Sequence, residues 1–261
     1  MQLEGKRALI TGAGSGIGQR LAIEAATRGI SLIITGRRPE ALSETLAKLP
    51  GKTHYAFNAD VTKAEDRTAL VEAVSAHWGA LDILVNHAGV VPVGSLAGST
   101  DDELETAVAT NLVAPISLIR QALPLLGRGE TARVVNIGSV LGDIPYPMMA
   151  VYSATKSGLR GFSIALRREL ESLGIGVTYA APRATRTAAA KALGPLVDAF
   201  GLKLDPPDAV ARRIWDAVAR DAKSVYPPGP EKMFVLVERL FPNIVDKSVA
   251  KQLAKFATAS A

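Results

Sequence analysis

Short apolar runs alternate with longer amphipathic segments along most of the chain. Six runs of strand length, rich in aliphatic residues, lie at positions 7–10, 31–35, 53–57, 82–85, 133–137 and 176–179. Between them, apolar residues recur every three or four positions, as on one face of a helix, over 17–28, 64–78, 102–126 and 151–173. Strands that alternate with helices in this way predict a parallel sheet with helices on its faces. We therefore expect one doubly wound α/β domain.

The pattern loosens after Pro182. We expect a helix of small residues near positions 184–193 and another helix over 205–222, and a stretch of this kind late in an α/β sheet can form a mobile lid. Farther on, apolar side chains again recur at helical spacing: Val237, Leu240, Phe241, Ile244, Val245, Val249, Leu253 and Phe256. Pro242 is expected to divide this tail into two short helices.

The tail is expected to be a C-terminal helical extension, residues 231–261, of a domain formed by residues 1–230. Its lysines at positions 247, 251 and 255 lie along a different line from the apolar residues. An amphipathic helix of this kind can rest weakly on a membrane surface. More often such a helix docks on its own domain or on a partner subunit. Both interpretations stay open on the sequence.

Composition and charge narrow the classes of function. The 261 residues include no cysteine, and His54, His77 and His87 stand far apart, so we expect neither disulfides nor a metal site. Basic residues are mixed with acids, so the formal net charge of +5 does not indicate the clustered patch of a nucleic-acid-binding protein. The N-terminal apolar stretch is too short for a signal peptide, and no run reaches the roughly 18 residues of a membrane span. We expect a soluble, cytoplasmic protein.

A glycine-rich segment, Thr11 to Gly18, follows the first predicted strand and opens the first predicted helix. Glycines there let the backbone approach a pyrophosphate, and the helix N-terminus attracts its charge. The alternative is a tight turn that holds no ligand. The second strand ends in Gly36-Arg37-Arg38, with no acid to hold a ribose 2′-hydroxyl. Two guanidinium groups suit a 2′-phosphate and predict a preference for NADPH over NADH, unless the pair merely caps a loop.

Tyr152 and Lys156 are four residues apart on a predicted helix, and Ser139 precedes Tyr152 by thirteen residues. Residues at this spacing lie on one helix face, so the ammonium group can lie near the phenol. A free tyrosine has a pKa of about 10, and a cation within about 4 to 6 Å lowers it by roughly 1 to 3 units. The pair therefore predicts a general acid/base that works near neutral pH.

These motifs resemble those of the shorter subclass of the short-chain dehydrogenase/reductase family. Residues 11–18 match its Thr-Gly-x-x-x-Gly-x-Gly turn, and Tyr152 and Lys156 match its Tyr-x-x-x-Lys pair. Residues 86–89 match its Asn-Asn-Ala-Gly stretch, with a histidine at the second position. The resemblance covers roughly residues 5–228 and implies a Rossmann fold.

The resemblance also implies roles for individual residues. Tyr152 would be the general acid when a carbonyl is reduced and the base when an alcohol is oxidised, and Lys156 would lower its pKa and hold the nicotinamide ribose. Ser139 would hydrogen-bond the substrate oxygen, and Asn111 would anchor a water relay to Lys156. Asp60 would contact the adenine. The implied cofactor-binding residues are Gly12, Ser15, Gly16, Ile17, Gly18, Arg37, Arg38, Asp60, Val61, Asn86, Ala88, Tyr152, Lys156 and Thr187.

Two features depart from the family pattern. Arg183 stands where the family usually has a glycine after Pro182, while Thr187 falls where a threonine meets the nicotinamide carboxamide. The arginine side chain either reaches an anionic substrate group or points to solvent. In addition, the chain continues about thirty residues past Pro228, where many relatives end in a turn that packs in a tetramer. The resemblance therefore implies a homo-oligomer, and the altered end favours a dimer over a tetramer.

The predicted function is an NADPH-dependent oxidoreductase that interconverts a carbonyl compound and its alcohol. The segments 90–93, 141–150 and 188–204 are expected to border the site, and their apolar residues favour a hydrophobic ketone or aldehyde. One alternative is a 3-oxoacyl thioester reductase, which the extended tail disfavours. The other is a sensor or scaffold that binds NADP(H) without turning over a substrate.

Overall fold

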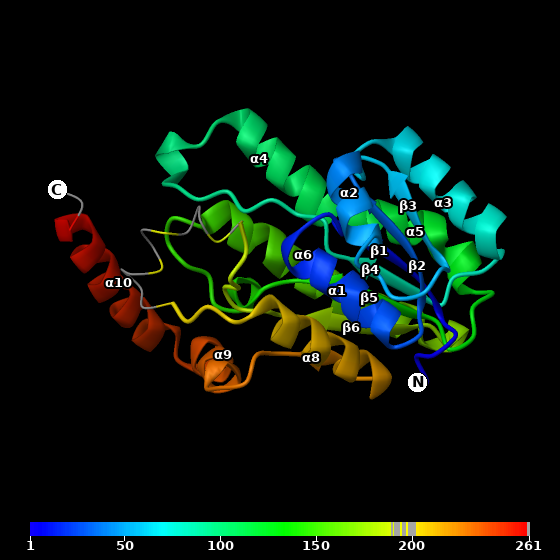
Figure 1. Cartoon of the computed structure of the whole chain (residues 1–261). Helices are drawn as coiled ribbons and strands as arrows, with labels where there is room; N and C mark the ends of the chain where they lie inside the picture. The colour runs from blue at the N-terminus through cyan, green and yellow to red at the C-terminus, as the bar shows by residue number, and fades with distance from the viewer. Residues whose placement is uncertain (189, 191–193, 195–196, 198–201, 260–261) are drawn as a thin grey trace.

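The computed structural model describes residues 1–188, 190, 194, 197 and 202–259. Seven parallel strands form one sheet in the order β3-β2-β1-β4-β5-β6-β7, with helices on both faces (Figure 1). The strands are β1 (Arg7–Thr11), β2 (Ser31–Gly36), β3 (His54–Asn58), β4 (Ile83–Asn86), β5 (Arg133–Ile137), β6 (Gly176–Ala180) and β7 (Ser224–Val225). The predicted doubly wound α/β sheet, a Rossmann arrangement, is confirmed.

The sheet separates two apolar cores, because successive side chains of a strand point to opposite faces. In β1, Ala8 and Ile10 join the core beneath α1 (Gly16–Thr27) and α8 (Pro207–Ala219). Leu9 points the other way, into a second core. That core is covered by three helices, namely α3 (Ala64–Trp78), α5 (Ala114–Leu126) and α6 (Ala150–Glu169). Strands that are buried on both faces explain the nearly continuous apolar runs.

The helix predicted over residues 102–126 is interrupted. It consists of α4 (Asp101–Val108), one wide π turn, η2 (Ala109–Val113), and α5. A membrane-spanning helix is one interpretation of this stretch by length and composition alone, and among the described residues it is the one stretch that meets that test. However, Leu118, Ile119 and other α5 residues are buried in the second core, so it packs as a core helix.

Two elements lie outside the predicted set. Helix α2 (Pro39–Leu46) has only two buried residues, and β7 is two residues long, so neither leaves a periodic pattern in the sequence. The described residues also form three short 3₁₀ helices, η1 (Leu96–Gly98), η3 (Val140–Gly142) and η4 (Glu171–Leu173). The small-residue helix and lid expected between 184 and 204 lie largely outside the described residues.

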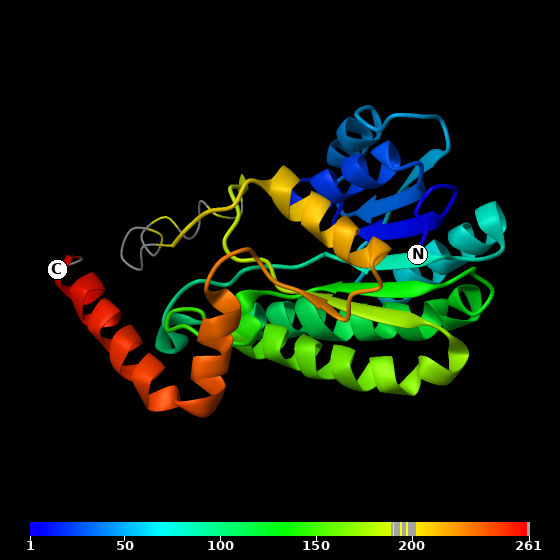
Figure 2. The same cartoon turned by 90° about the horizontal axis from the view of Figure 1, so that it is seen from below.

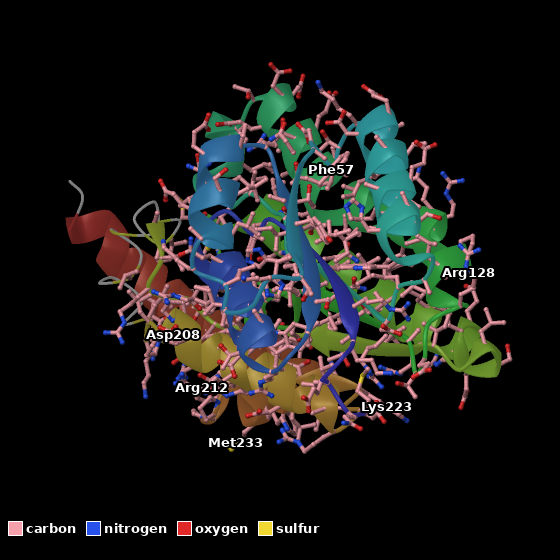
Figure 3. The ribbon with its side chains drawn as sticks, turned by 45° about the vertical axis from the view of Figure 1, so that its right-hand side comes forward. Phe57, Arg128, Asp208, Arg212, Lys223 and Met233 are labelled. Carbon is pink, nitrogen blue, oxygen red and sulfur yellow. The ribbon has the colours of Figure 1, made fainter. Side chains whose placement is uncertain are left out.

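The tail forms α9 (Glu231–Leu240) and α10 (Pro242–Ala259), with Pro242 opening the second helix as expected. Figure 2 shows both helices beyond the carboxyl ends of the strands, with α10 continuing away from the sheet. Met233 on α9 points outward at the edge of the molecule (Figure 3). The tail therefore adds to the end of the sheet where parallel α/β folds carry their ligand sites.

Candidate active site

A cavity of about 1160 Å³ opens at the carboxyl ends of the strands. One end is lined by the glycine-rich turn after β1 and by the segment after β2. The middle is lined by Ser139, Tyr152 and Lys156, and the other end by apolar residues that include members of α9 and α10. The cavity is larger than most single-ligand pockets, so a cofactor and a second molecule fit side by side.

The glycine-rich turn packs tightly against the segment after β4. A Cβ atom at Gly12 would lie 2.8 Å from the Cα of Ala88, and Gly12 has a positive φ of +68°. A Cβ at Gly18 would lie 2.2 Å from the Gly12 carbonyl oxygen. The Thr11 hydroxyl accepts hydrogen bonds from the backbone N–H groups of His87 and Ala88, both at 3.0 Å. These contacts hold the N-terminus of α1 open towards the cavity, as anion binding requires.

The arginine pair after β2 lines the same end of the cavity. Arg38 is the N-cap residue of α2, and its side chain donates to the Ser15 hydroxyl at 3.5 Å rather than capping that helix. Asp60 and Val61, which follow β3, line the cavity beside this pair, and Asp60 accepts two hydrogen bonds from Thr62. Burial tends to raise the pKa of Asp60, but the Thr62 hydrogen bonds and the nearby charge of Arg37 lower it below its usual value.

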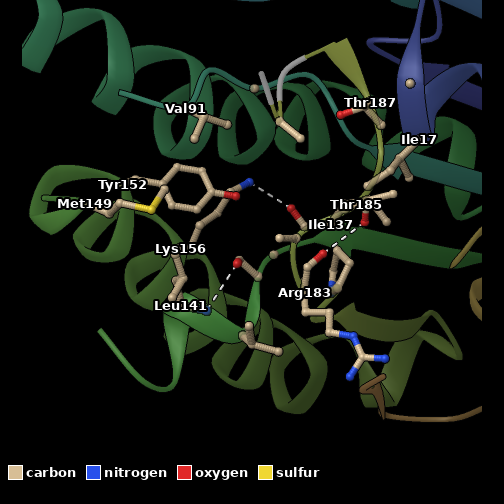
Figure 4. Close-up of a pocket in the computed structure, with 18 of the residues that line it drawn as sticks. Ile17, Val91, Ile137, Leu141, Met149, Tyr152, Lys156, Arg183, Thr185 and Thr187 are labelled. Atoms are coloured by element: carbon tan, nitrogen blue, oxygen red, sulfur yellow. Dashed lines mark hydrogen bonds between the residues drawn. The ribbon is translucent and has the colours of Figure 1, made fainter. Parts of the chain in front are cut away.

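Tyr152 and Lys156 come from the first two turns of α6 (Figure 4), and Ser139 is the N-cap residue of η3. The Lys156 Nζ donates to the carbonyl oxygen of Ile137 at 2.9 Å and lies 5.6 Å from the centre of the Tyr152 ring. The Ser139 Oγ accepts from the backbone N–H of Leu141 at 3.1 Å, so its own proton is free to rotate towards the cavity. The structure thus brings the three predicted groups together.

Burial controls the protonation of this group more than mutual charge does. It raises the pKa of Tyr152 to about 12, against the lowering effect of a hydrogen bond with Ser139. It also lowers the pKa of Lys156 to about 8. In this structure the pKa of Tyr152 is therefore raised, not lowered as predicted, because desolvation of the phenolate outweighs the hydrogen bond with Ser139.

Three of the predicted site residues lie behind the cavity wall. Gly18 packs on the turn, and the Asn86 side chain donates to Asn136 of β5 at 2.9 Å. Asn111, in the π turn, accepts from the Val90 N–H at 2.8 Å and donates to Val90 O at 2.9 Å. Gly18 and the two asparagine side chains therefore support the cavity wall from behind. The water relay expected of Asn111 stays a prediction.

Comparisons with known proteins agree with this geometry. Residues 6–196 match the family model for short chain dehydrogenases. The chain is 34% identical over 181 residues to the 3-oxoacyl acyl-carrier-protein reductase FabG of Staphylococcus aureus, covering 68% of this chain and 73% of that protein. It is 30% identical over 247 residues to estradiol 17-beta-dehydrogenase 11 of Macaca fascicularis, covering 91% and 80%.

The chain belongs to the short-chain dehydrogenase/reductase family. A member from Burkholderia phymatum, solved in complex with NAD, has the same fold with a TM-score of 0.87 and 24% identity, and the match covers 94% of this chain and 96% of that one. As a member of this family, the protein is an oxidoreductase that acts on a carbonyl or alcohol with a nicotinamide dinucleotide.

His87 occupies the second position of the family's Asn-Asn-Ala-Gly stretch. Its Nδ1 lies 2.9 Å from the place of a Cβ at Gly12 and 2.6 Å from that of a Cβ at Gly18, so the ring fills the space behind the turn. Burial, and to a smaller extent the charge of Lys156, lower the pKa of His87 to about 4. The ring is therefore neutral at physiological pH.

The position of the Arg183 side chain differs from both sequence-based interpretations, a contact with an anionic substrate group and an orientation towards solvent. Its guanidinium points away from Tyr152 and Lys156 (Figure 4) and forms ion pairs with Asp205, at 2.7 Å, and with Glu231. It neither reaches towards a substrate nor points into solvent, because two nearby carboxylates neutralise it. Thr187, four residues on, packs over Gly16, with its Cγ2 3.2 Å from the place of a Cβ there.

The outer wall of the cavity includes residues that the sequence did not assign to the site. Six apolar ones come from the tail, namely Met233, Phe234, Val237, Ile244, Val245 and Val249. Val91, Leu141 and Met149 line the same cavity. Helical spacing marked most of the tail residues as one apolar face, but nothing in the sequence indicated that this face meets the site. The wall is mainly apolar and suits an uncharged substrate.

Proposed function

We propose that this protein is an NADPH-dependent reductase of hydrophobic ketones or aldehydes. The observation that carries the proposal is one continuous cavity in which Ser139, Tyr152 and Lys156 stand between a glycine-rich turn and an apolar wall. That arrangement supplies a cofactor end, a proton donor and a place for an apolar carbonyl compound.

Side chains of this protein would donate the proton that the reduction needs and stabilise the charge that remains. The Ser139 and Tyr152 hydroxyls would both hydrogen-bond the carbonyl oxygen, and Tyr152 would give its phenolic proton to that oxygen as the carbonyl carbon is reduced. A tyrosine pKa of about 12 keeps the phenol protonated before the reaction. Lys156, still mostly protonated at pH 7 with a pKa of about 8, would stabilise the phenolate left behind.

The glycine cradle fits a dinucleotide, because side chains at Gly12 or Gly18 would collide with the surrounding backbone. Bound NADPH would supply the hydride. Arg37 and Arg38, which line the ribose end without an acid at the end of β2, support the preference for a 2′-phosphate.

The general-acid role is tested by replacing Tyr152 with phenylalanine. We expect Tyr152→Phe to lower kcat by about 10²- to 10⁴-fold on any carbonyl compound that the wild type reduces, because the proton donor is lost. NADPH oxidation over a panel of ketones and aldehydes provides the measurement, with a fluorescence titration showing that NADPH still binds. A wild type that binds NADPH but reduces nothing in the panel would favour the sensor or scaffold instead.

The cofactor preference is tested by comparing kcat/KM for NADPH and NADH. We expect NADPH to be favoured by at least about tenfold, and a double Arg37→Ala, Arg38→Ala variant to lose most of that preference, because charge-assisted hydrogen bonds to the phosphate are removed. The double variant should leave the NADH value within about twofold of wild type. Equal use of both cofactors by the wild type would contradict the proposal.

A second candidate is reduction of 3-oxoacyl thioesters, which is supported by the name of the Staphylococcus aureus relative, a 3-oxoacyl acyl-carrier-protein reductase. The tail of this chain favours free ketones, since its apolar helices occupy the outer wall of the cavity. Parallel assays with a 3-oxoacyl thioester and a free ketone of the same chain length distinguish the two.

We also propose that the protein is cytoplasmic and a homodimer, with weak peripheral membrane contact through its tail. Val108 and Val113, near the π turn, are 41% and 49% exposed, which supports a subunit contact on this side of the molecule. The exposed apolar residues of α9 support the membrane contact.

A further inference from the structure

Helix α9 has few buried residues for an element that lines the cavity. Val235 is its one buried residue, while Met233, Phe234, Leu236 and Leu240 are each about half exposed or more. Apolar burial alone therefore holds this helix weakly. What distinguishes it is an ionic cluster at each end.

The first cluster joins Arg183 to Glu231, the first residue of α9, and to Asp205. The side chains of the three residues are only 10%, 16% and 7% exposed. Asp205 is itself fixed, because its backbone N–H donates to Ala184 O at 2.9 Å and its carbonyl accepts from the Arg186 N–H at 2.9 Å. Arg183 thus ties the start of α9 to the segment that follows β6.

The approach of Glu231 to Arg183 depends on the glycine before the helix. Gly229 has a φ of +136°, and a Cβ there would lie 2.6 Å from the Glu231 Oε2. A side chain at this position would therefore push the carboxylate out of the cluster. The ion pair between Glu231 and Arg183 therefore requires a glycine in the turn that leads into α9.

The second cluster surrounds Asp143, whose side chain is fully buried. Asp143 binds Arg160 of α6 at 2.7 Å, Arg239 of α9 at 3.0 Å and the Tyr226 hydroxyl at 2.9 Å. Asp143 follows Ser139 by four residues, and Arg160 follows Lys156 by four. The end of α9 is therefore tied to the two segments that carry the catalytic side chains.

Between these two attachments, α9 lines the cavity with Phe234 and Val237, and Met233 lies at the outer rim of the cavity. We propose that Arg183 and Asp143, acting through the two ionic clusters, position α9 as the outer wall of the substrate pocket and so set the length of carbonyl compound that the site accepts. This inference rests on the proposed reductase function. Both are positioning residues, since their contacts run to α9 rather than to the reacting atoms.

The physical reason is the cost of a buried charge without its partner. Removing the charge of Arg183 leaves the largely buried Glu231 carboxylate of α9 without an ion-pair partner among the described residues, and that charge then moves towards water if the helix can move. Removing the charge of Arg239, which is 50% exposed, takes away the tie between α9 and Asp143, while Asp143 keeps its ion pair with Arg160. Helix α9 is free to move, since it lies outside the two main cores. Loss of the ion pairs should therefore displace the wall while the sheet stays folded.

The experiment uses the full-length protein with Arg183→Met, Arg239→Met and both together. These changes keep the apolar stem of each arginine and remove its charge. The matched control is Arg28→Met, because Arg28 also pairs with two carboxylates, Glu24 and Asp216, but joins α1 to α8 away from the cavity. Each variant is assayed with a short and a long aliphatic methyl ketone, and hydrogen exchange is followed over residues 231–240.

We expect the double variant to raise the ratio of the long-ketone KM to the short-ketone KM by about tenfold, corresponding to about 1.4 kcal/mol of lost contact with the long chain. Exchange over α9 should accelerate, and each single variant should show part of both effects. Arg28→Met should leave the ratio and the exchange as in wild type.

An unchanged KM ratio with unchanged exchange in the double variant would overturn the inference, as would a rise in KM that is equal for both ketones. If the wild type reduces neither ketone, the proposed function fails. In that case the exchange experiment still decides whether the ionic clusters hold α9.

Discussion

Tyr152, Lys156 and His87 are titratable side chains that line the same cavity, and burial shifts all three towards their uncharged forms. The tyrosine and histidine are then neutral at pH 7, whereas Lys156, with a pKa of about 8, stays mostly protonated. Helical spacing identified Tyr152 and Lys156 as neighbours, but spacing carries no information about how much protein surrounds them. For that reason the direction of the tyrosine pKa shift could not be predicted from the sequence.

His87 gives a prediction about acid stability. Its pKa of about 4 in the folded protein lies below the unfolded value of 6.5, so the unfolded chain gains a proton first as the pH falls. Stability from this group is therefore complete above pH 6.5 and is lost between pH 6.5 and about 4. We expect His87→Asn to reduce the loss of unfolding free energy between pH 7 and 4.5 by about 2 to 3 kcal/mol.

Urea denaturation of the wild type and the variant at several pH values provides the measurement. His77→Asn is the control, since it replaces a histidine that is exposed on α3, far from the cavity, in the same way. Parallel curves for the wild type and His87→Asn would show that His87 does not titrate as the structure implies.

At the scale of elements, the strength of the local pattern decides what the sequence predicts. Strands β1, β2, β4, β5 and β6 and helices α1, α3, α6 and α8 have buried residues that repeat along the element, and the sequence predicted each of them, as it did the edge strand β3, which has no buried residue. The π turn at Asn111 escaped prediction because it accompanies hydrogen bonds between that side chain and Val90, 21 residues away. A tertiary contact of this kind leaves no periodic signal.

The glycines of α1 and α6 give a prediction at this scale. Gly18→Ala would place a Cβ 2.2 Å from the Gly12 carbonyl oxygen, so we expect a loss of unfolding free energy on the order of 1 to 3 kcal/mol and weaker NADPH binding. Gly161→Ala on the exposed side of α6 meets no atom within 4 Å and should instead stabilise by about 0.5 to 1 kcal/mol.

Urea denaturation and NADPH fluorescence titration of both variants provide the measurements. Both substitutions add one methyl group to a helical glycine. A loss of unfolding free energy in Gly18→Ala together with a gain in Gly161→Ala would therefore show that the loss comes from the packing around the turn. Normal stability and normal NADPH affinity in Gly18→Ala would contradict the close contact.

At the scale of the whole molecule, the tail has two apolar surfaces with different surroundings. One surface faces the cavity through Val237, Val245 and Val249. On the other, Leu236, Leu240 and Phe241 are each more than half exposed, and Lys232, Lys247 and Lys251 lie exposed on the same two helices. The sequence predicted the helices but not this division, because it depends on where α9 and α10 meet the sheet.

The outward surface supports a prediction about membrane contact. Exposed leucines beside lysines favour weak binding to an anionic lipid surface, with apolar side chains in the interface and ammonium groups near the headgroups. We expect the full chain to co-sediment with anionic vesicles, less with neutral ones, and less in high salt. A double Leu236→Ser, Leu240→Ser variant should reduce the bound fraction at least about fivefold, because two apolar anchors are lost.

The matched control is Leu173→Ser, which removes an equally exposed leucine from η4, far along the chain from the tail. NADPH titration of each protein checks that the cavity is intact, since neither Leu236 nor Leu240 lines it in the described part of the chain. Equal sedimentation of the wild type and the double variant would leave the outward surface to a partner subunit, and gel filtration of both would then show whether the variant dissociates a dimer.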